Sequence, residues 1–233
     1  MVIIVCNILI ALLGLGLNRC MANLIDCFAN DEKITYTSVF KKRKFDWKLG
    51  LITPLILIAL FFKFGISFEF LLFGFLAVIL IMDAFVDMKA QIIPNGLNFT
   101  CFVVGIVAMY FYLVFNNDKG VDMLLGMFTG AGIFSLIALF AYIAYKREGM
   151  GLGDVKLMGA IGLFFGIFDT IQIFILSFAI GAVVSIILLL LKVKKSSDYL
   201  AFGPFIVLAT FITMFLPHGV LLPWYLGLIN GMM

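Results

Sequence analysis

Charged residues are scarce in this chain. Of its 233 residues, only 12% are Asp, Glu, Lys or Arg, whereas 64% are apolar. A soluble domain usually has about 25% charged and about 45–50% apolar residues. A core of this size cannot bury so many apolar side chains. The composition therefore excludes an ordinary soluble domain and indicates a protein whose surface is covered largely by lipid.

Histidine and paired cysteines are also nearly missing. The sequence has one histidine, His218, and four cysteines, none in a Cys-x-x-Cys spacing. This pattern argues against a structural zinc site, and the single histidine argues against a serine-type catalytic triad. The net charge of +3 is too small for a nucleic-acid footprint. We therefore expect no metal, no cofactor and no nucleic-acid partner.

Long apolar runs recur along the whole sequence. A membrane helix needs about 20 mostly apolar residues, and these runs are too unbroken for barrel strands. The first run has no charged segment before it, so we expect a retained span rather than a cleaved signal peptide. The sequence predicts an all-α polytopic membrane protein with about eight segments (six to eight), at 2–18, 49–66, 68–86, 97–115, 121–145, 155–168, 170–191 and 203–230. Pro217 and Pro223 indicate that the last segment is broken.

The basic residues predict an orientation. If the N-terminus lies outside and every segment crosses, all of the 16 Lys and Arg residues except Lys63 and Lys119 fall on one side. The positive-inside rule places that side in the cytoplasm of a cell-membrane protein. The polar insert at 30–48 lies there, and its KKRK run is expected to attract anionic headgroups, with partner binding as the alternative. We expect a single integral-membrane domain over residues 1–233.

Two aspartates end the third predicted segment. Asp83 and Asp87 are four residues apart and therefore share one face of a helix. A Pro-Asn pair follows: Pro94 favours an extended conformation before it, and Asn95 is a good N-cap for the next helix. Asp87 is thus expected at a helix end on the cytoplasmic side. Taken alone, it could equally be an interfacial aspartate paired with Lys89.

A third aspartate follows a glycine-rich stretch, at the end of Gly149-Met150-Gly151-Leu152-Gly153-Asp154. The glycines permit close approach of the backbone. Asp154 precedes an apolar helical run, so its plain alternative role is that of a helix N-cap. In the predicted topology, Asp87 and Asp154 lie at the same membrane depth.

Two carboxylates at one membrane depth can form a catalytic pair. Bundle helices pack about 8–10 Å apart, so a glycine-lined loop can bring one carboxylate to the other. Carboxylates that share a site do not both ionise readily, and the pair holds one proton. The ionised member can activate a water that attacks a peptide carbonyl, and the protonated member can protonate the leaving amine. Helix dipoles favour Asp87 as the acid and Asp154 as the base.

The order and membrane setting of these motifs resemble the type IV prepilin peptidase family, which includes the archaeal preflagellin (prearchaellin) peptidases. The resemblance covers about residues 70–216 and rests on Gly-x-Gly-Asp at 151–154, Asp87 with Ile-Pro-Asn ending at Asn95, and Phe-Gly-Pro-Phe at 202–205. It implies an aspartic-type endopeptidase whose catalytic residues are Asp87 and Asp154. It also implies that Gly151, Gly153, Pro94 and Asn95 support the site through the two motifs and their loops.

Three further residues are candidate auxiliaries. Asp83 lies one helical turn before Asp87, but it lacks the family's offset from the Ile-Pro-Asn tail. Lys89 and Lys156 each stand two residues after a proposed catalytic aspartate. They could contact substrate, although snorkelling to the membrane interface is the simpler interpretation of such lysines.

The resemblance also implies a substrate. It would be a type IV pilin-like or archaellin-like precursor whose short basic leader is removed at the cytoplasmic face, just before a hydrophobic helix. Membrane lipid is the other expected partner. Bacterial members often carry a Cys-x-x-Cys insert, and many N-methylate the product. Cys20 and Cys27 form no such pair, so the resemblance does not extend to these features.

Two other hypotheses use the same aspartates. A presenilin or signal-peptide-peptidase type protease also has Gly-x-Gly-Asp, but here Met82 and Val86 stand where that class has a tyrosine, and Pro-Ala-Leu is absent. A proton- or cation-coupled transporter would use Asp83 and Asp87 as its ion site. The transporter hypothesis predicts that neutralising Asp83 matters most, and the peptidase hypothesis that neutralising Asp87 or Asp154 does.

Overall fold

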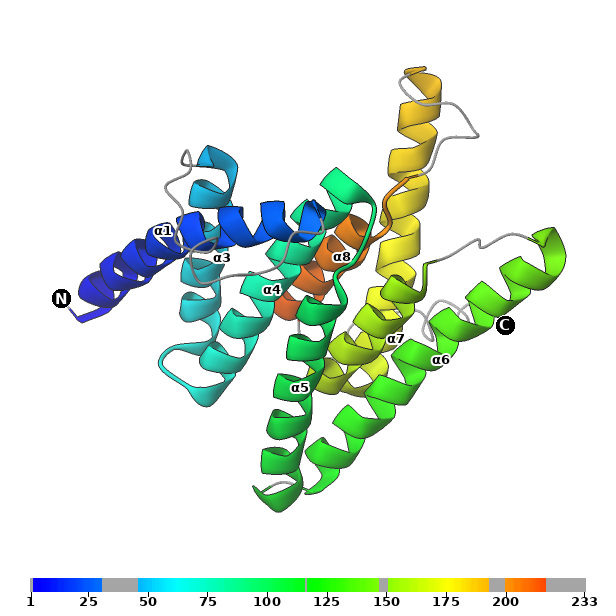
Figure 1. Cartoon of the computed structure of the whole chain (residues 1–233). Coiled ribbons are helices and arrows are strands. Elements are labelled where there is room, and N and C mark those ends of the chain that lie inside the picture. The colour runs from blue at the N-terminus through cyan, green and yellow to red at the C-terminus, as the bar shows by residue number, and fades with distance from the viewer. Residues whose placement is uncertain (1, 31–45, 116, 147–150, 193–199, 217–233) are drawn as a thin grey trace, which may run out of the picture. The chain divides into compact units, whose positions relative to one another are not determined.

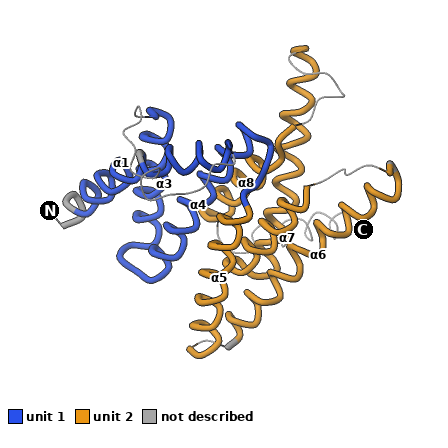
Figure 2. Tube along the Cα trace, in the orientation of Figure 1, with its two compact units in different colours: residues 1–94 blue, residues 95–233 orange. Residues whose placement is uncertain are grey.

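The chain folds into helices that form two compact units. The computed structural model describes residues 2–30, 46–115, 117–146, 151–192 and 200–216. Residues 1–94 form the first unit and residues 95–233 the second (Figure 2). The described helices are α1 (Val2–Ala29), α3 (Trp47–Phe64), α4 (Phe68–Ala90), α5 (Asn95–Phe115), α6 (Asn117–Tyr145), α7 (Leu152–Leu190) and α8 (Gly203–Phe215) (Figure 1).

The lengths of these helices match a membrane protein. Six of the described helices, α1 and α3 to α7, are long and apolar enough to cross a membrane, and α8 is a shorter apolar helix. The described ranges contain no strand. The predicted all-α polytopic membrane fold is therefore confirmed. The KKRK run and the segment after residue 216, with Pro217 and Pro223, lie outside the described residues.

In the first unit, α1 packs against α3 and α4, and α3 packs against α4. Gly14 of α1 lies directly against Pro54 of α3, because a Cβ added at Gly14 would stand 3.0 Å from the Pro54 Cα. The Asn18 side chain donates a hydrogen bond to the Asp46 carbonyl oxygen over 2.7 Å. The Asp46 carboxylate in turn caps α3 by accepting the Lys48 N–H over 3.0 Å.

Helix α1 is longer than predicted. The apolar run ends near residue 18, whereas the helix continues to Ala29. Its last turns are amphipathic: Met21, Ile25 and Cys27 are buried, while Asp26 is half-exposed. A hydropathy pattern marks only the lipid-facing part of such a helix. The predicted boundary at residue 18 was therefore wrong.

The second unit is built around close contact between α6 and α7. Glycines allow the two backbones to touch: a Cβ added at Gly126 would stand 2.5 Å from the Gly162 carbonyl oxygen. A Cβ at Gly130 would similarly collide with the Met158 carbonyl oxygen. Small residues at such interfaces are how membrane helices approach closely without a hydrophobic driving force. Helix α5 packs against both α6 and α7, and α8 packs against α7.

Helix α7 reverses direction at Gly166. This residue has φ 80° and ψ −175°, a conformation that favours glycine. Moving along α6, Gly126 lies against Gly162 and Gly166, and Gly130 against both Met158 and Thr170. The residues of α7 before and after Gly166 therefore pass the same part of α6 in opposite directions. The two halves of α7 are antiparallel (Figure 1).

The position of this reversal differs from the prediction. Two segments over 155–168 and 170–191 were predicted, with the turn at Asp169. The chain instead turns at Gly166, and Asp169 lies within the second half of the helix, buried. Asp122 of α6 closes the break, because its carboxylate accepts the Ile167 N–H over 3.1 Å. This side chain supplies the cap that the second half of α7 requires.

Candidate active site

Two aspartates lie in the last turns of α4. The Asp83 side chain is 1% exposed and the Asp87 side chain 5%. The helix ends at Ala90, and Gln91 adopts a left-handed conformation with φ 55° while its N–H donates to the Asp87 carbonyl oxygen over 2.8 Å. Residues 92–94 then form the non-helical link to α5, as expected of a residue followed by proline. Asp87 therefore sits at a helix end, as the sequence predicted.

Asp83 is held in a desolvated position. Both of its carboxyl oxygens are buried and lack a hydrogen-bond partner among the described residues. Lys89, two residues after Asp87, forms an ion pair with Asp26 of α1, with 3.0 Å between Nζ and Oδ1. The predicted auxiliary lysine thus bonds to a carboxylate from another helix of the same unit, 63 residues away in the sequence.

Asp154 lies in the first turn of α7. The helix begins at Leu152 and its N-cap is Gly151, which makes no side-chain cap. The Asp154 N–H donates to the Gly151 carbonyl oxygen over 3.1 Å, and the Asp154 side chain is half-buried. The alternative role of Asp154 as a plain N-cap was therefore wrong, because the helix starts three residues earlier than predicted.

Gly151 gives the Asp154 carboxylate its space. A Cβ added at Gly151 would stand 3.3 Å from Asp154 Oδ2. A larger residue at that position would therefore press on the carboxylate. This close contact is a structural reason for glycine at the first position of the Gly-x-Gly-Asp motif.

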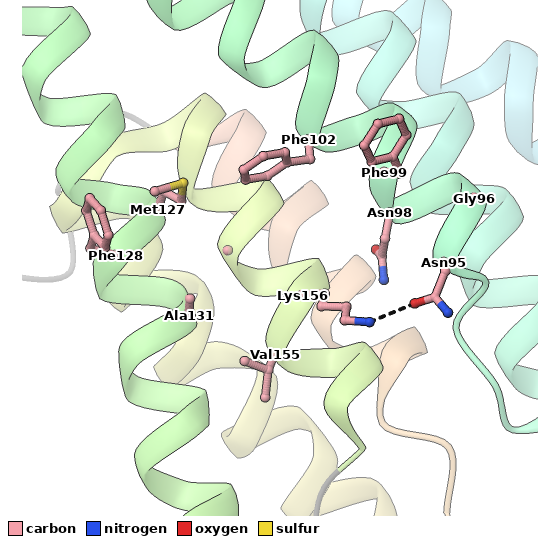
Figure 3. Close-up of a pocket in the computed structure, with 11 residues that line it drawn as sticks. Asn95, Gly96, Asn98, Phe99, Phe102, Met127, Phe128, Ala131, Val155 and Lys156 are labelled. Carbon is pink, nitrogen blue, oxygen red and sulfur yellow. Dashed lines mark hydrogen bonds between the residues drawn. The ribbon is translucent and has the colours of Figure 1, made fainter.

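The start of α5 and the start of α7 lie together. Lys156 Nζ donates to Asn95 Oδ1 over 2.9 Å (Figure 3). Asn98 Nδ2 donates to the Gly153 carbonyl oxygen over 3.3 Å. The Pro-Asn and Gly-x-Gly-Asp motifs, which are about 60 residues apart, thus meet through side chains of the second unit. Asn95 is the first residue of α5 rather than its predicted N-cap.

Sequence reasoning missed Asn98. It is 4% exposed, and its Oδ1 atom is buried without a hydrogen-bond partner among the described residues. Its spacing of three residues from Asn95 puts both amides on one face of α5, which is a detectable signal in an otherwise apolar helix. Asp87 and Asp83 belong to the first unit, whereas Asn95, Asn98, Asp154 and Lys156 belong to the second.

An apolar groove of about 810 Å³ opens beside the Gly-x-Gly-Asp turn. It lies among α5, α6 and α7, and it is lined by Asn95, Gly96, Asn98, Phe99, Phe102, Met127, Phe128, Ala131, Val155, Lys156 and Gly159 (Figure 3). Its volume lies within the range of about 300–1,000 Å³ that is typical of small-molecule sites. Among the described residues, no cluster of three or more His, Cys, Asp or Glu side chains is arranged to hold a metal ion.

The fold and these motifs define a class: polytopic helical membrane proteins that carry Gly-x-Gly-Asp at the start of a buried helix. Residues 70–186 match the type IV leader peptidase family, which is half of the chain. The chain belongs to this family. The matched range includes Asp83, Asp87 and Asp154.

Individual relatives agree with this assignment. A prepilin leader peptidase/N-methyltransferase of Legionella pneumophila is 31% identical over 165 residues, covering 70% of this chain and 56% of that protein. The protein of the same name from Pseudomonas aeruginosa is 30% identical over 58% of this chain and 46% of its own length. Leader peptidase HopD of Escherichia coli is 35% identical over 54% of this chain and 80% of its own length.

The chain spans about half the length of the prepilin leader peptidase/N-methyltransferase relatives that it matches. No solved structure matches the chain significantly.

Proposed function

We propose that this protein is a membrane aspartic endopeptidase that removes the leader from prepilin-like precursors. The observation that carries the proposal is the family match over residues 70–186, which includes the whole Gly-x-Gly-Asp turn and the end of α4. The names of the relatives point to prepilin leaders as the substrate class. This match favours the prepilin peptidase hypothesis over a presenilin-type protease and over a transporter.

In the proposed mechanism, Asp87 and Asp154 share one proton and one water. Asp154, in the first turn of α7, takes a proton from the water as its oxygen attacks the scissile carbonyl carbon. Asp87, in the last turn of α4, hydrogen-bonds the carbonyl oxygen and then protonates the leaving amine as the C–N bond breaks. General acid–base catalysis of this kind contributes typically about 10²–10⁴-fold. Both carboxyls must reach one water, so substrate binding is proposed to bring them together.

The site is proposed to face the cytoplasm at the cell membrane. The support is the asymmetry of Lys and Arg between the two predicted sides. A basic leader would then remain on the side where it is made, and the hydrophobic helix behind it would remain in lipid. In this topology, the last turn of α4 and the first turn of α7 both lie at that membrane face.

The test uses membranes that contain the full-length protein and a tagged prepilin. We expect Asp87→Asn and Asp154→Asn each to lower cleavage at least about 100-fold, because each removes one acid–base partner. Asp118→Asn, an exposed position at the start of α6, is the matched control and should cleave normally. Normal cleavage by either of the first two variants would refute the mechanism.

Two further measurements separate the alternatives. Asp83→Asn should weaken cleavage less than Asp87→Asn does, whereas a transporter would lose ion flux and show no proteolysis in any variant. Disulfide trapping between cysteines at 87 and 154 tests whether the carboxyls meet. It requires a background in which the four free cysteines, Cys6, Cys20, Cys27 and Cys101, are replaced. No cross-link with precursor present would exclude a shared water.

A further inference from the structure

We infer that the apolar groove among α5, α6 and α7 binds an apolar side chain of the precursor, and that Asn98 accepts a backbone N–H of the same segment. This inference rests on the proposed function, and it adds a substrate-binding site to it. The groove belongs to the second unit alone, and its wall includes Val155 and Lys156, the two residues that follow Asp154. An occupant of the groove therefore lies beside the proposed base.

The Asn98 side chain identifies the chemistry of the occupant. Its Nδ2 already donates to the Gly153 carbonyl oxygen, and its Oδ1 is buried without a partner among the described residues. A buried acceptor that lacks a donor destabilises the fold, because it has lost its hydrogen bonds to water. An occupant that supplies an N–H or O–H group would satisfy this oxygen. A polypeptide backbone supplies N–H groups at every residue except proline, whereas a lipid acyl chain has none.

The rest of the groove indicates which part of a precursor it holds. The wall opposite Asn98 is apolar and includes Met127, Phe128 and Ala131 (Figure 3). Lys156 is the one charged residue of the lining, and it is cationic and exposed. A cation at the groove repels a basic leader. The groove is therefore complementary to the hydrophobic side of the cut bond, with one side chain in the groove and its backbone near Asn98.

Two residues of α6 in the groove wall test this assignment, the exposed Phe128 and the half-buried Ala131. Phe128 lines the groove and is 62% exposed, so Phe128→Ala enlarges the groove at little cost in folding. Phe140 lies on the same helix, is 72% exposed and does not line the groove, so Phe140→Ala is its matched control. Ala131→Leu narrows the groove, and Ala138→Leu, two turns further along the same face of α6, is the control for it.

The experiment measures kcat and KM for precursors whose first residues after the cut carry side chains of increasing size. We expect Phe128→Ala to shift the preference towards larger side chains and Ala131→Leu towards smaller ones, each by about tenfold in relative kcat/KM. Phe140→Ala and Ala138→Leu should keep the wild-type preference. The signature is a size-dependent change, which a general loss of stability does not produce.

The role of Asn98 is tested through the precursor backbone. Precursors N-methylated at one residue at a time, starting from the second residue after the cut bond, lose one N–H each. We expect one position to raise the wild-type KM by about 2- to 12-fold, the worth of a typical hydrogen bond. In Asn98→Leu, the same N-methylation should have no further effect. Equal N-methylation effects in both proteins would overturn the assignment of Asn98.

The outcomes also separate this inference from the proposed function. If wild-type protein cleaves no precursor, the proposed function fails. If it cleaves, but the groove variants and their controls show the same preference for side-chain size, only the groove assignment is overturned. If the effect of Phe128→Ala follows the acyl-chain length of the vesicle lipids instead of the precursor side chain, the groove is a lipid site and the inference is wrong.

Discussion

Replacing Gly126 by alanine tests the contact between α6 and α7. The added Cβ would stand 2.5 Å from the Gly162 carbonyl oxygen and 2.7 Å from the Gly166 Cα, whereas ordinary contact begins at 3.4 Å. The helices must therefore separate locally by about 0.9 Å, the difference between 3.4 and 2.5 Å. Forcing a methyl group into a well-packed interface costs typically about 1–3 kcal/mol. Gly126→Ala should lower the free energy of unfolding by that amount relative to a glycine-to-alanine substitution that makes no clash.

The matched control is Gly132→Ala on the same helix. A Cβ added at Gly132 meets nothing within 4 Å, so this substitution should gain about 0.5–1 kcal/mol from helix propensity alone. The measurement is equilibrium unfolding in mixed detergent–lipid micelles, monitored by far-ultraviolet circular dichroism. Both variants gain the same helix propensity, so they should differ by the cost of the clash alone, about 1–3 kcal/mol. If they differ by less than about 0.5 kcal/mol, the two backbones do not touch as described.

Three other substitutions give expected outcomes in the same unfolding assay. Gly166→Ala should destabilise by at least about 1–3 kcal/mol, because φ is 80° and the new Cβ meets the Asp122 carboxylate; wild-type stability would contradict the reversal. Asp122→Ala should cost about 0.5–2 kcal/mol, since the Ile167 N–H loses its acceptor, and Asp122→Asn should cost less; equal costs would argue against capping. Lys89→Met should change stability by less than about 1 kcal/mol, because its ion pair with Asp26 is partly exposed; a larger loss would show a role beyond that pair.

The membrane helices were predictable because their length and composition are dictated by lipid. Their ends were predictable only where a local signal exists. Pro94 marks the end of α4 to within a few residues, since proline restricts the residue before it. The extension of α1 carries no comparable signal: Asn18 and Asn23 are polar by sequence but buried in the fold. Only tertiary packing determines that these asparagines continue a helix.

The reversal in α7 shows how a polar residue can mislead. Asp169 is the one carboxylate between the two apolar runs, so it was the natural place for a turn at the membrane surface. In the fold Asp169 is buried, and the turn occurs at Gly166, whose φ of 80° is a conformation that glycine adopts readily. The partner that closes this turn, Asp122, lies 45 residues away along the chain. No local pattern connects the two positions.

At the site, the sequence motifs predicted that Asp87 lies near the end of one helix and Asp154 near the start of another, but not the surroundings of either. Asp154 was expected before its helix and lies inside the first turn, because Leu152 begins the helix. The bonds of Lys89 to Asp26 and of Lys156 to Asn95 span 63 and 61 residues. Contacts of such long range depend on how helices pack, which spacing along one chain does not encode.

The first half of α7 has a further consequence for the surrounding bilayer. From Leu152 to Phe165 it contains 14 residues, and at about 1.5 Å per residue it is about 21 Å long. The hydrocarbon layer of a typical membrane is about 30 Å thick. This half-helix is therefore too short to reach from one surface to the other, and neighbouring helices rather than lipid cover most of it, because residues 157–166 are buried. At least one end of this half-helix must therefore lie below the membrane surface, where only protein or a water-filled cavity can satisfy its polar backbone groups.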